Sequence, residues 1–248
     1  MNIVDIAQFY TQPLGKTTQE LLAAKLQVPL QVQPDQLVAG LGFASPYLNG
    51  DSRSVSFMMA RAGVIHWPIV GTVRSALVDE LDLPLSDNSV DVALLVHALE
   101  FAESAEDLLQ EVWRVLTPQG KLILVVPNRR GLWSSSDATP FGQGQPFSRS
   151  QLSALLKDAQ FVISNMQQAL VGPPWGSAGL ARVLEPASGF GFGRLSGAIL
   201  VEATKQVYAY STGKLVRRAL PRIRPMLLPR PQPAARGEAR CRAPGQSE

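Results

Sequence analysis

The feature that most constrains this chain is a regular alternation of short apolar runs with longer helical or turn-rich stretches. The connections between the runs are too long for hairpins, so successive runs are expected to be parallel strands joined by crossovers. The sequence therefore predicts an α/β fold built on a parallel sheet. Strands are expected at residues 36–39, 54–59, 73–78, 90–96, 121–126, 161–164 and 198–208.

Three segments have the apolar spacing of a helix. Residues 17–27 place leucines on one face of a helix. At its start, Thr17 or Thr18 can accept a hydrogen bond from a free N–H group of the first turn. Residues 105–116 show the clearest pattern, and residues 150–159 form the third segment. Residues 127–147, rich in glycine and proline, are expected to form a long mobile loop, and loops of that length usually cover a site.

Composition limits the class of protein. A chain of 248 residues with one cysteine, Cys241, can bury a sizeable core without a disulfide or a metal, and it is neither a collagen, a coiled coil nor a disulfide scaffold. The first residues do not have the pattern of a signal peptide, and the longest apolar run, 90–102, contains Asp91, His97 and Glu100. The prediction is a cytoplasmic protein without a transmembrane segment.

Charge is distributed unevenly along the chain. Residues 213–248 hold nine basic and two acidic residues, a net charge of +7, and six prolines, whereas the preceding residues carry −4. We therefore predict a folded domain at 1–212, whose first 30 or so residues form a helical lid, and a disordered basic tail at 213–248. Two interpretations of the tail stay open: an apolar stripe from Leu215 to Ile223 docks on an anionic surface or a partner, or the tail is a solvated extension without a target.

A glycine pair follows the first predicted strand, in Val38-Ala-Gly40-Leu-Gly42-Phe-Ala44. Glycines let a cofactor approach the backbone because no Cβ intervenes. Ser45 and Pro46 suit the start of a helix whose free N–H groups would face this loop. A G-x-G pair also occurs in ordinary turns, so the pair alone does not distinguish a cofactor loop from a structural turn.

Two later stretches carry a more specific signal. The first contains Asp79, Leu83-Pro84 and an acidic turn from Asp87 to Asp91, and the second contains Glu111, Arg114, Leu116, Pro118 and Gly120. In both, the chain resembles the class I S-adenosylmethionine-dependent methyltransferases, in particular the type 11 methyltransferase family. The resemblance covers residues 36–165. It implies a Rossmann-like, seven-stranded, mostly parallel sheet with helices on both faces and one antiparallel strand near the C-terminus.

The resemblance also implies a cofactor, S-adenosylmethionine, at the carboxyl ends of the first strands. By position, Gly40, Gly42 and Ala44 would lie under its methionine part, and Asp79 would accept a hydrogen bond from its adenine amino group. The neighbouring Glu80 is also a candidate cofactor-binding residue. Tyr10, in the N-terminal segment, would close over the cofactor as a lid, although core packing explains this residue equally well.

Three positions depart from the family pattern. Val38 stands where an acid usually precedes the first glycine, Ala44 replaces the third glycine, and residues 57–60 at the end of the second strand offer no acid for the ribose hydroxyls. These departures motivate an alternative: a catalytically inactive domain that keeps the fold and acts as a binding or regulatory partner.

His97 is the one weak candidate for a catalytic residue. It follows the fourth predicted strand, where a base near neutral pH would face cofactor and substrate, but a histidine at such a junction is more often structural. Neither His97 nor His66 can form a metal site with the distant Cys241, so no metal is predicted.

The sequence thus predicts a methyltransferase acting on a small-molecule or lipid-like substrate. Nucleic acid is disfavoured as a partner because the body of the chain is net acidic and shows no basic and aromatic face.

Overall fold

The computed structural model describes residues 3–48, 53–59, 74–175, 185 and 196–207. Residues Met1–Tyr208 make one compact unit. The basic segment 213–248 lies outside the described residues, so its predicted disorder and docking stay predictions. His66 also lies outside them.

Seven strands form one sheet in the order β3-β2-β1-β4-β5-β7-β6. The strand β7 is antiparallel to both of its neighbours, β5 and β6, and the pairings among the first five strands are parallel. The predicted mixed sheet with one antiparallel strand near the C-terminus is therefore confirmed. The strands are β1 (Leu37–Gly42), β2 (Arg53–Met59), β3 (Arg74–Val78), β4 (Val90–Val96), β5 (Leu116–Pro127), β6 (Phe161–Ala169) and β7 (Ala198–Lys205).

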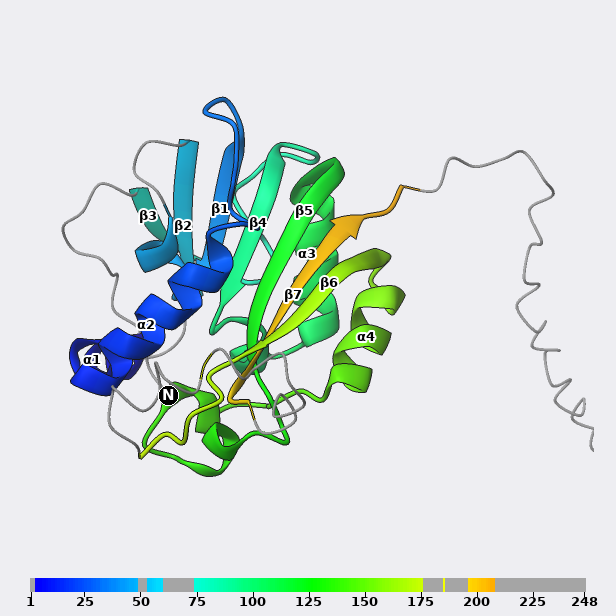
Figure 1. Ribbon diagram of the computed structural model, residues 1–248. Coiled ribbons are helices and arrows are strands. Elements are labelled where there is room, and N and C mark those ends of the chain that lie inside the picture. Colours follow the sequence, from blue (N-terminus) through cyan, green and yellow to red (C-terminus); the bar gives the residue numbers. More distant parts are fainter. Residues whose placement is uncertain (1–2, 49–52, 60–73, 176–184, 186–195, 208–248) are drawn as a thin grey trace, which may run out of the picture. The chain divides into compact units, whose positions relative to one another are not determined.

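Helices cover both faces of the sheet, as predicted. The helices α1 (Ile3–Thr11) and α2 (Pro13–Leu26) pack on one face, and α3 (Ala105–Val115) and α4 (Arg149–Asp158) pack on the other. Figure 1 shows α2 crossing in front of the sheet and α3 behind it. Each face has its own core because neighbouring residues of a strand point to opposite sides, so Leu95 belongs to the α3 core and Leu94 to the α2 core.

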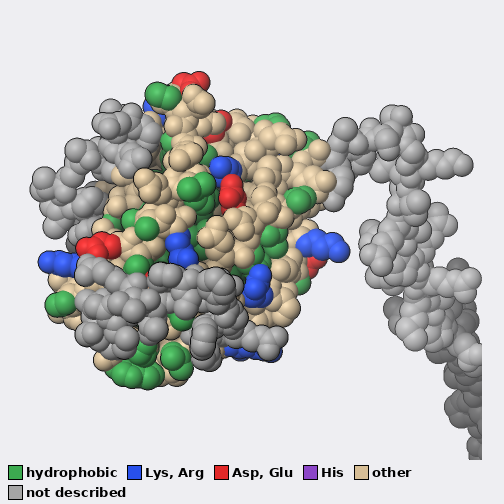
Figure 2. All heavy atoms as spheres, in the orientation of Figure 1, with side chains coloured by type: hydrophobic (Ala, Val, Ile, Leu, Met, Phe, Trp, Pro, Cys, Tyr) green, Lys and Arg blue, Asp and Glu red, His purple; other side chains and the backbone are tan. Residues whose placement is uncertain are grey.

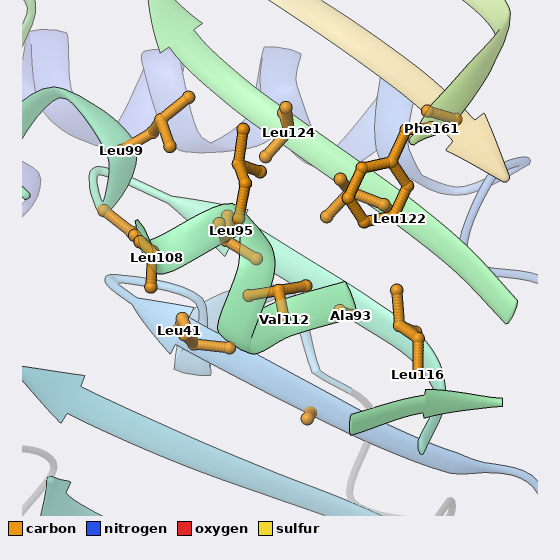
Figure 3. Close-up of a cluster of buried hydrophobic side chains, with 14 of the residues drawn as sticks. Leu41, Ala93, Leu95, Leu99, Leu108, Val112, Leu116, Leu122, Leu124 and Phe161 are labelled. Carbon is orange, nitrogen blue, oxygen red and sulfur yellow. The ribbon is translucent and has the colours of Figure 1, made fainter. Parts of the chain in front are cut away.

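The core under α3 explains the strongest helix prediction. Leu108 and Val112 of α3 pack against Leu95 and Leu124 of the central strands, and all four side chains are fully buried (Figure 3). Burying each leucine contributes about 1.5–3 kcal/mol. The Ser104 side chain caps α3 by accepting a hydrogen bond from the backbone N–H of Asp107.

Two predictions about where helices begin are wrong. The helix α2 begins at Pro13, so Thr17 and Thr18 lie inside it, and Thr18 donates its hydroxyl proton to the Leu14 carbonyl. No α-helix begins at Ser45 among the described residues: a three-residue 3-10 helix, η1 (Ser45–Tyr47), follows β1. The Ser45 hydroxyl instead lies 2.7 Å from the Ser56 hydroxyl of β2.

The segment 127–147, predicted to be a long mobile loop, has local structure of its own. It contains the 3-10 helices η3 (Leu132–Ser135) and η4 (Pro140–Gly142), and it buries Trp133 and Phe141 against the α2 core. Burial of two large aromatic rings holds a glycine- and proline-rich segment that has no long helix or strand of its own.

Candidate functional site

A buried polar cluster lies where the carboxyl ends of β1 and β4 meet. The chain leaves these two neighbouring strands toward opposite sides of the sheet. Open α/β sheets bind their ligands at such a point. Four elements supply the cluster: α1, the turn and 3-10 helix after β1, η2 (Leu99–Phe101) after β4, and η4. We call it the switch-point cluster, and it consists of Tyr10, Phe43, Tyr47, His97, Glu100 and Phe141.

A chain of hydrogen bonds runs through the cluster. The Tyr10 hydroxyl lies 2.9 Å from His97 Nε2, and His97 Nδ1 lies 2.8 Å from Glu100 Oε1. Burial, then the neighbouring Tyr47 and Glu100, raise the pKa of Tyr10, so its phenol stays protonated at neutral pH. When the imidazole is neutral and Glu100 is ionised, Nδ1–H donates a hydrogen bond to the carboxylate. Nε2 then accepts a hydrogen bond from the Tyr10 hydroxyl.

Aromatic rings enclose the His97 side chain. The Tyr10 ring stacks on Phe43, with centroids 4.7 Å apart and planes at 9°. The edge of Phe141 meets the imidazole at a centroid distance of 4.7 Å. The side chains of His97 and Glu100 are 0% exposed, so solvent does not reach this pair in the conformation described.

Two polar atoms of the cluster are buried without a hydrogen bond. The Tyr47 hydroxyl and Glu100 Oε2 have no partner among the described residues. Buried polar atoms are nearly always paired, because an unpaired one loses its hydration without compensation. The cluster thus has spare capacity to accept hydrogen bonds.

The backbone of His97 is strained. Its φ is +51°, in the left-handed region that non-glycine residues rarely adopt. Strain of this kind persists only where the surrounding structure holds it, and it gathers at functional sites. Sequence patterns gave no signal of this strain, and neither Glu100 nor Tyr47 was identified as a site residue from the sequence.

The glycine pair lies inside β1 rather than in a loop after it. Gly40 and Gly42 pair with Leu94 and Val96 of β4. Gly42 has a φ of +73°, and a Cβ there would collide with the Val96 carbonyl oxygen. A Cβ on Gly40 would lie 2.9 Å from Leu48 Cδ1.

The space beside this pair is therefore filled by the chain itself. A Cβ on Gly40 would also lie 2.7 Å from the Ala44 Cβ, and Ala44 is fully buried. The predicted role of Gly40, Gly42 and Ala44 beneath a cofactor stays a prediction.

The two acids after β3 have different surroundings. Asp79 is exposed, and its Oδ1 accepts a hydrogen bond from the backbone N–H of Leu81. Glu80 is buried, and its Oε1 accepts from the backbone N–H of Glu103, 2.7 Å away. Asp79 thus presents a carboxylate at the end of β3, whereas Glu80 ties this turn to the start of α3.

The family signature residues of α3 form a clamp outside the cluster. The Arg114 guanidinium donates to the carbonyls of Leu83 and Leu85, and Glu111 accepts from the backbone N–H of Leu83. Glu111 and Arg114 also form an ion pair with each other, at 2.6 Å. These residues hold the turn between β3 and β4 in place, which is a structural role.

Two of the hollows lined by described residues lie near the sheet and its helices. One of about 770 Å³ lies on the α3 and α4 side and is lined by Glu106, Phe147 and Gln151, among others. Another of about 380 Å³ lies between α2 and η1 and reaches the cluster through Tyr47. Within the described ranges, no group of three metal-ligating side chains occurs. No helix in those ranges is long and apolar enough to cross a membrane.

Comparison with known proteins gives a family match and a fold. Residues 54–124 match the family model described as a methyltransferase domain. No curated protein matches the chain by sequence. A structure from Thermotoga maritima, described as an S-adenosylmethionine-dependent methyltransferase and possible histamine N-methyltransferase, is similar with a TM-score of 0.56. It is 16% identical, and the match covers 82% of this chain and 96% of that one.

Two further structures are similar at lower scores. Geranyl diphosphate C-methyltransferase from Streptomyces coelicolor has a TM-score of 0.52 at 16% identity, over 75% of this chain and 78% of that one. The [4+2]-cyclase SpnF has a TM-score of 0.51 at 18% identity, over 75% and 80%. At such low sequence identity these structural similarities show a shared fold and nothing more. One of the similar structures is a cyclase, so the fold alone does not determine the reaction.

Proposed function

Because the chain carries the sequence signature and the fold of a class I methyltransferase, we propose that it is an S-adenosylmethionine-dependent methyltransferase acting on a small-molecule or lipid-like acceptor. The observation that carries this proposal is the family match at 54–124. It lies on a seven-stranded mixed sheet of the kind that the resemblance implies. The match contains the turn that holds Asp79 and the clamp that positions this turn. The recognition of the family from these same residues is confirmed.

The described residues fit one end of the cofactor. The exposed Asp79 carboxylate is suited to accept a hydrogen bond from the adenine amino group. At the other end, Tyr10 and Phe43 cover the ends of β1 and β4, and β2 ends in the buried Met58 and Met59. Binding of the methionine part therefore requires α1, which carries Tyr10, to move.

The nature of the acceptor is supported by a neighbour and by the surface. The Streptomyces enzyme is described in complex with geranyl diphosphate, magnesium and S-adenosyl-L-homocysteine, which supports a small, lipid-like acceptor. Figure 2 shows basic and acidic side chains of the described residues interspersed on the visible face. This distribution does not favour nucleic acid, whose backbone selects a continuous basic surface. The cytoplasmic location stays a prediction.

Titration calorimetry of the full chain with S-adenosylmethionine and S-adenosylhomocysteine tests the proposal. We expect binding of both, and about tenfold weaker binding in Asp79→Asn because a charge-assisted hydrogen bond becomes a neutral one. Asp82→Asn removes the same charge three residues away and is expected to bind normally. A folded chain that gives no heat and no thermal shift with either ligand would refute the proposal.

A second function is favoured by one observation. The strand ends are closed by the chain's own side chains, with Phe43 only 2% exposed and the Gly40 backbone covered by Leu48. Such closure fits a domain that kept the fold and lost the reaction, and that serves as a binding or regulatory partner. This domain would not need α1 to move away from the strand ends to admit a cofactor. Failure of the folded chain to bind either ligand would select this second function.

A further inference from the structure

We propose that His97 is the proton acceptor of the site, that Glu100 is its positioning residue, and that the substrate therefore carries a proton on the atom to be methylated. The substrate class is a hydroxyl or amine compound. This inference rests on the proposed methyl transfer. It assigns a chemistry to the switch-point cluster, which the family signature residues do not contact.

The geometry of the pair fits a general base. Glu100 Oε1 lies 2.8 Å from His97 Nδ1, which fixes the ring orientation and leaves Nε2 as the basic nitrogen. The carboxylate also stabilises the imidazolium that forms when Nε2 takes a proton. The pair is dry, so the attraction between the two charges is weakly screened.

The Tyr10 hydroxyl marks the place of the substrate. It lies at hydrogen-bond distance from Nε2, where a proton-bearing group must be for transfer to occur. Its ring stacks on Phe43, so a flat or apolar group attached to the hydroxyl has a surface to pack on. When α1 moves, an acceptor hydroxyl or amine takes over both contacts.

The proton and the electrons balance in one step. The acceptor oxygen or nitrogen forms a bond to the methyl carbon, whose bond to the donor sulfur breaks with its electron pair staying on sulfur. The proton of the acceptor moves to His97 Nε2 and leaves to solvent when α1 opens. Glu100 keeps its charge throughout and acts only on the orientation and stability of the imidazole.

Two features of the pair go beyond what a histidine paired at both nitrogens requires. Such a histidine needs no left-handed backbone, yet His97 has a φ of +51° and is one of five non-glycine residues with a positive φ among those described. It also needs no spare acceptor, yet Glu100 Oε2 is buried without a hydrogen bond among the described residues. Both features are expected where the protein pre-organises a site for a ligand group that is yet to bind.

Nitrogen NMR of the full chain tests the orientation without any substrate. The chain has two histidines, so the His66→Gln variant leaves only the His97 signals. At pH 8 we expect a protonated Nδ1 and an unprotonated Nε2. Glu100→Gln, which still offers an oxygen to Nδ1, should keep this tautomer, and Glu100→Met should lose it. A protonated Nε2 in the chain with Glu100 intact would overturn the proposal.

Methyl transfer from labelled S-adenosylmethionine tests the substrate class. The acceptors are phenol, geraniol and benzylamine, with benzenethiol as the comparison because it is largely ionised at neutral pH and needs no base. We expect transfer to a hydroxyl or amine acceptor, and a 10²- to 10⁴-fold lower kcat in His97→Gln, which should still bind S-adenosylhomocysteine. Glu100→Gln should lower kcat less, and Glu100→Asp should recover part of it.

The pH profile separates a base from a structural residue. The titratable groups that contact the imidazole are Tyr10 from α1 and Glu100 from η2, and Tyr47 from η1 lies next to Tyr10. The rise of kcat with pH should vanish in His97→Gln and persist in Tyr47→Phe.

The outcomes distinguish the two proposals. A chain that binds S-adenosylhomocysteine but methylates only benzenethiol, or none of the hydroxyl and amine acceptors, overturns the substrate class and leaves the methyltransferase proposal standing. A chain that binds neither ligand refutes the methyltransferase proposal and, with it, this inference.

Discussion

Tyr10 and His97 lie 87 positions apart in the chain, yet the Tyr10 phenol oxygen is 2.9 Å from His97 Nε2. This hydrogen bond joins the first helix to the end of a central strand. The position of α1 is therefore coupled to the state of the imidazole, and changes at either residue should be detected at the other.

The Tyr10 hydroxyl is expected to stabilise the fold at neutral pH. Tyr10→Phe keeps the ring on Phe43 but leaves Nε2 buried without a donor, so the free energy of unfolding should fall by about 1–3 kcal/mol. Tyr47→Phe is the matched control, because the Tyr47 hydroxyl lies next to Tyr10 but meets no hydrogen-bond geometry among the described residues, so its removal should cost less. Urea denaturation of both variants measures the difference. Equal losses would contradict the hydrogen-bond assignment.

Alkaline pH is expected to destabilise the chain through the same two tyrosines. Burial raises the pKa of both Tyr10 and Tyr47 in the folded state. Their contribution is fully present below the unfolded value of about 10 and is lost as the pH rises above it, because only the unfolded chain then ionises. The urea midpoint should fall as the pH rises above about 10, and it should fall less in a Tyr10→Phe, Tyr47→Phe double variant. An identical fall in the double variant would argue against this source.

Gly42 is expected to tolerate no side chain. Its φ of +73° and the collision of a Cβ with the Val96 carbonyl oxygen leave no relaxed geometry, so Gly42→Ala should lower stability by about 2 kcal/mol or more. Gly40→Ala is the control. Its Cβ would lie 2.7 Å from the buried Ala44 Cβ and 2.9 Å from Leu48 Cδ1, so this variant also loses stability. The loss should be smaller than for Gly42 because the backbone is not left-handed and the colliding atoms belong to side chains. Thermal unfolding ranks the two variants, and the reverse order would show that the strand end can rearrange.

Acid pH is expected to weaken the clamp on the turn between β3 and β4. Hydrogen bonds from Arg114 lower the pKa of Glu111 in the folded state. Stability from this pair is therefore present above the unfolded pKa of about 4.3 and is lost as the pH falls through the lower folded value. Glu111→Gln should be less stable at pH 7 and show a flatter decline below about pH 4. Denaturation midpoints between pH 7 and pH 3 test this, with Glu106→Gln on the exposed side of α3 as the control.

Much of the fold was predictable because its elements are specified locally. The predicted run at 90–96 coincides with β4, since every residue there is apolar except Asp91 and the strand is buried on both faces. The capped and strongly amphipathic pattern at 105–116 likewise matches α3. Elements that depend on distant contacts were missed: η3 and η4 form because Trp133 and Phe141 find buried positions in the α2 core.

The candidate site was less predictable for the same reason. His97 could be identified from its position after a strand, but its partners come from α1 and η2, and no local pattern indicates that Tyr10 and Glu100 meet at one imidazole. The residues that carried the family resemblance, Glu111 and Arg114, are structural. A signature identified from sequence therefore led to the correct fold without locating the buried polar cluster.

The strand order has a consequence for synthesis on the ribosome. Among the described residues, β6 lies at the edge of the sheet with β7 as its neighbour, and β7 is the last of the seven strands in chain order. A nascent chain that has emerged only as far as residue 175 can assemble β1 to β5, but β6 has no neighbour on which to form its ladder. Vectorial folding must therefore wait for the final strand to insert between β5 and β6, and until then two unprotected edges are open to capture by a chaperone.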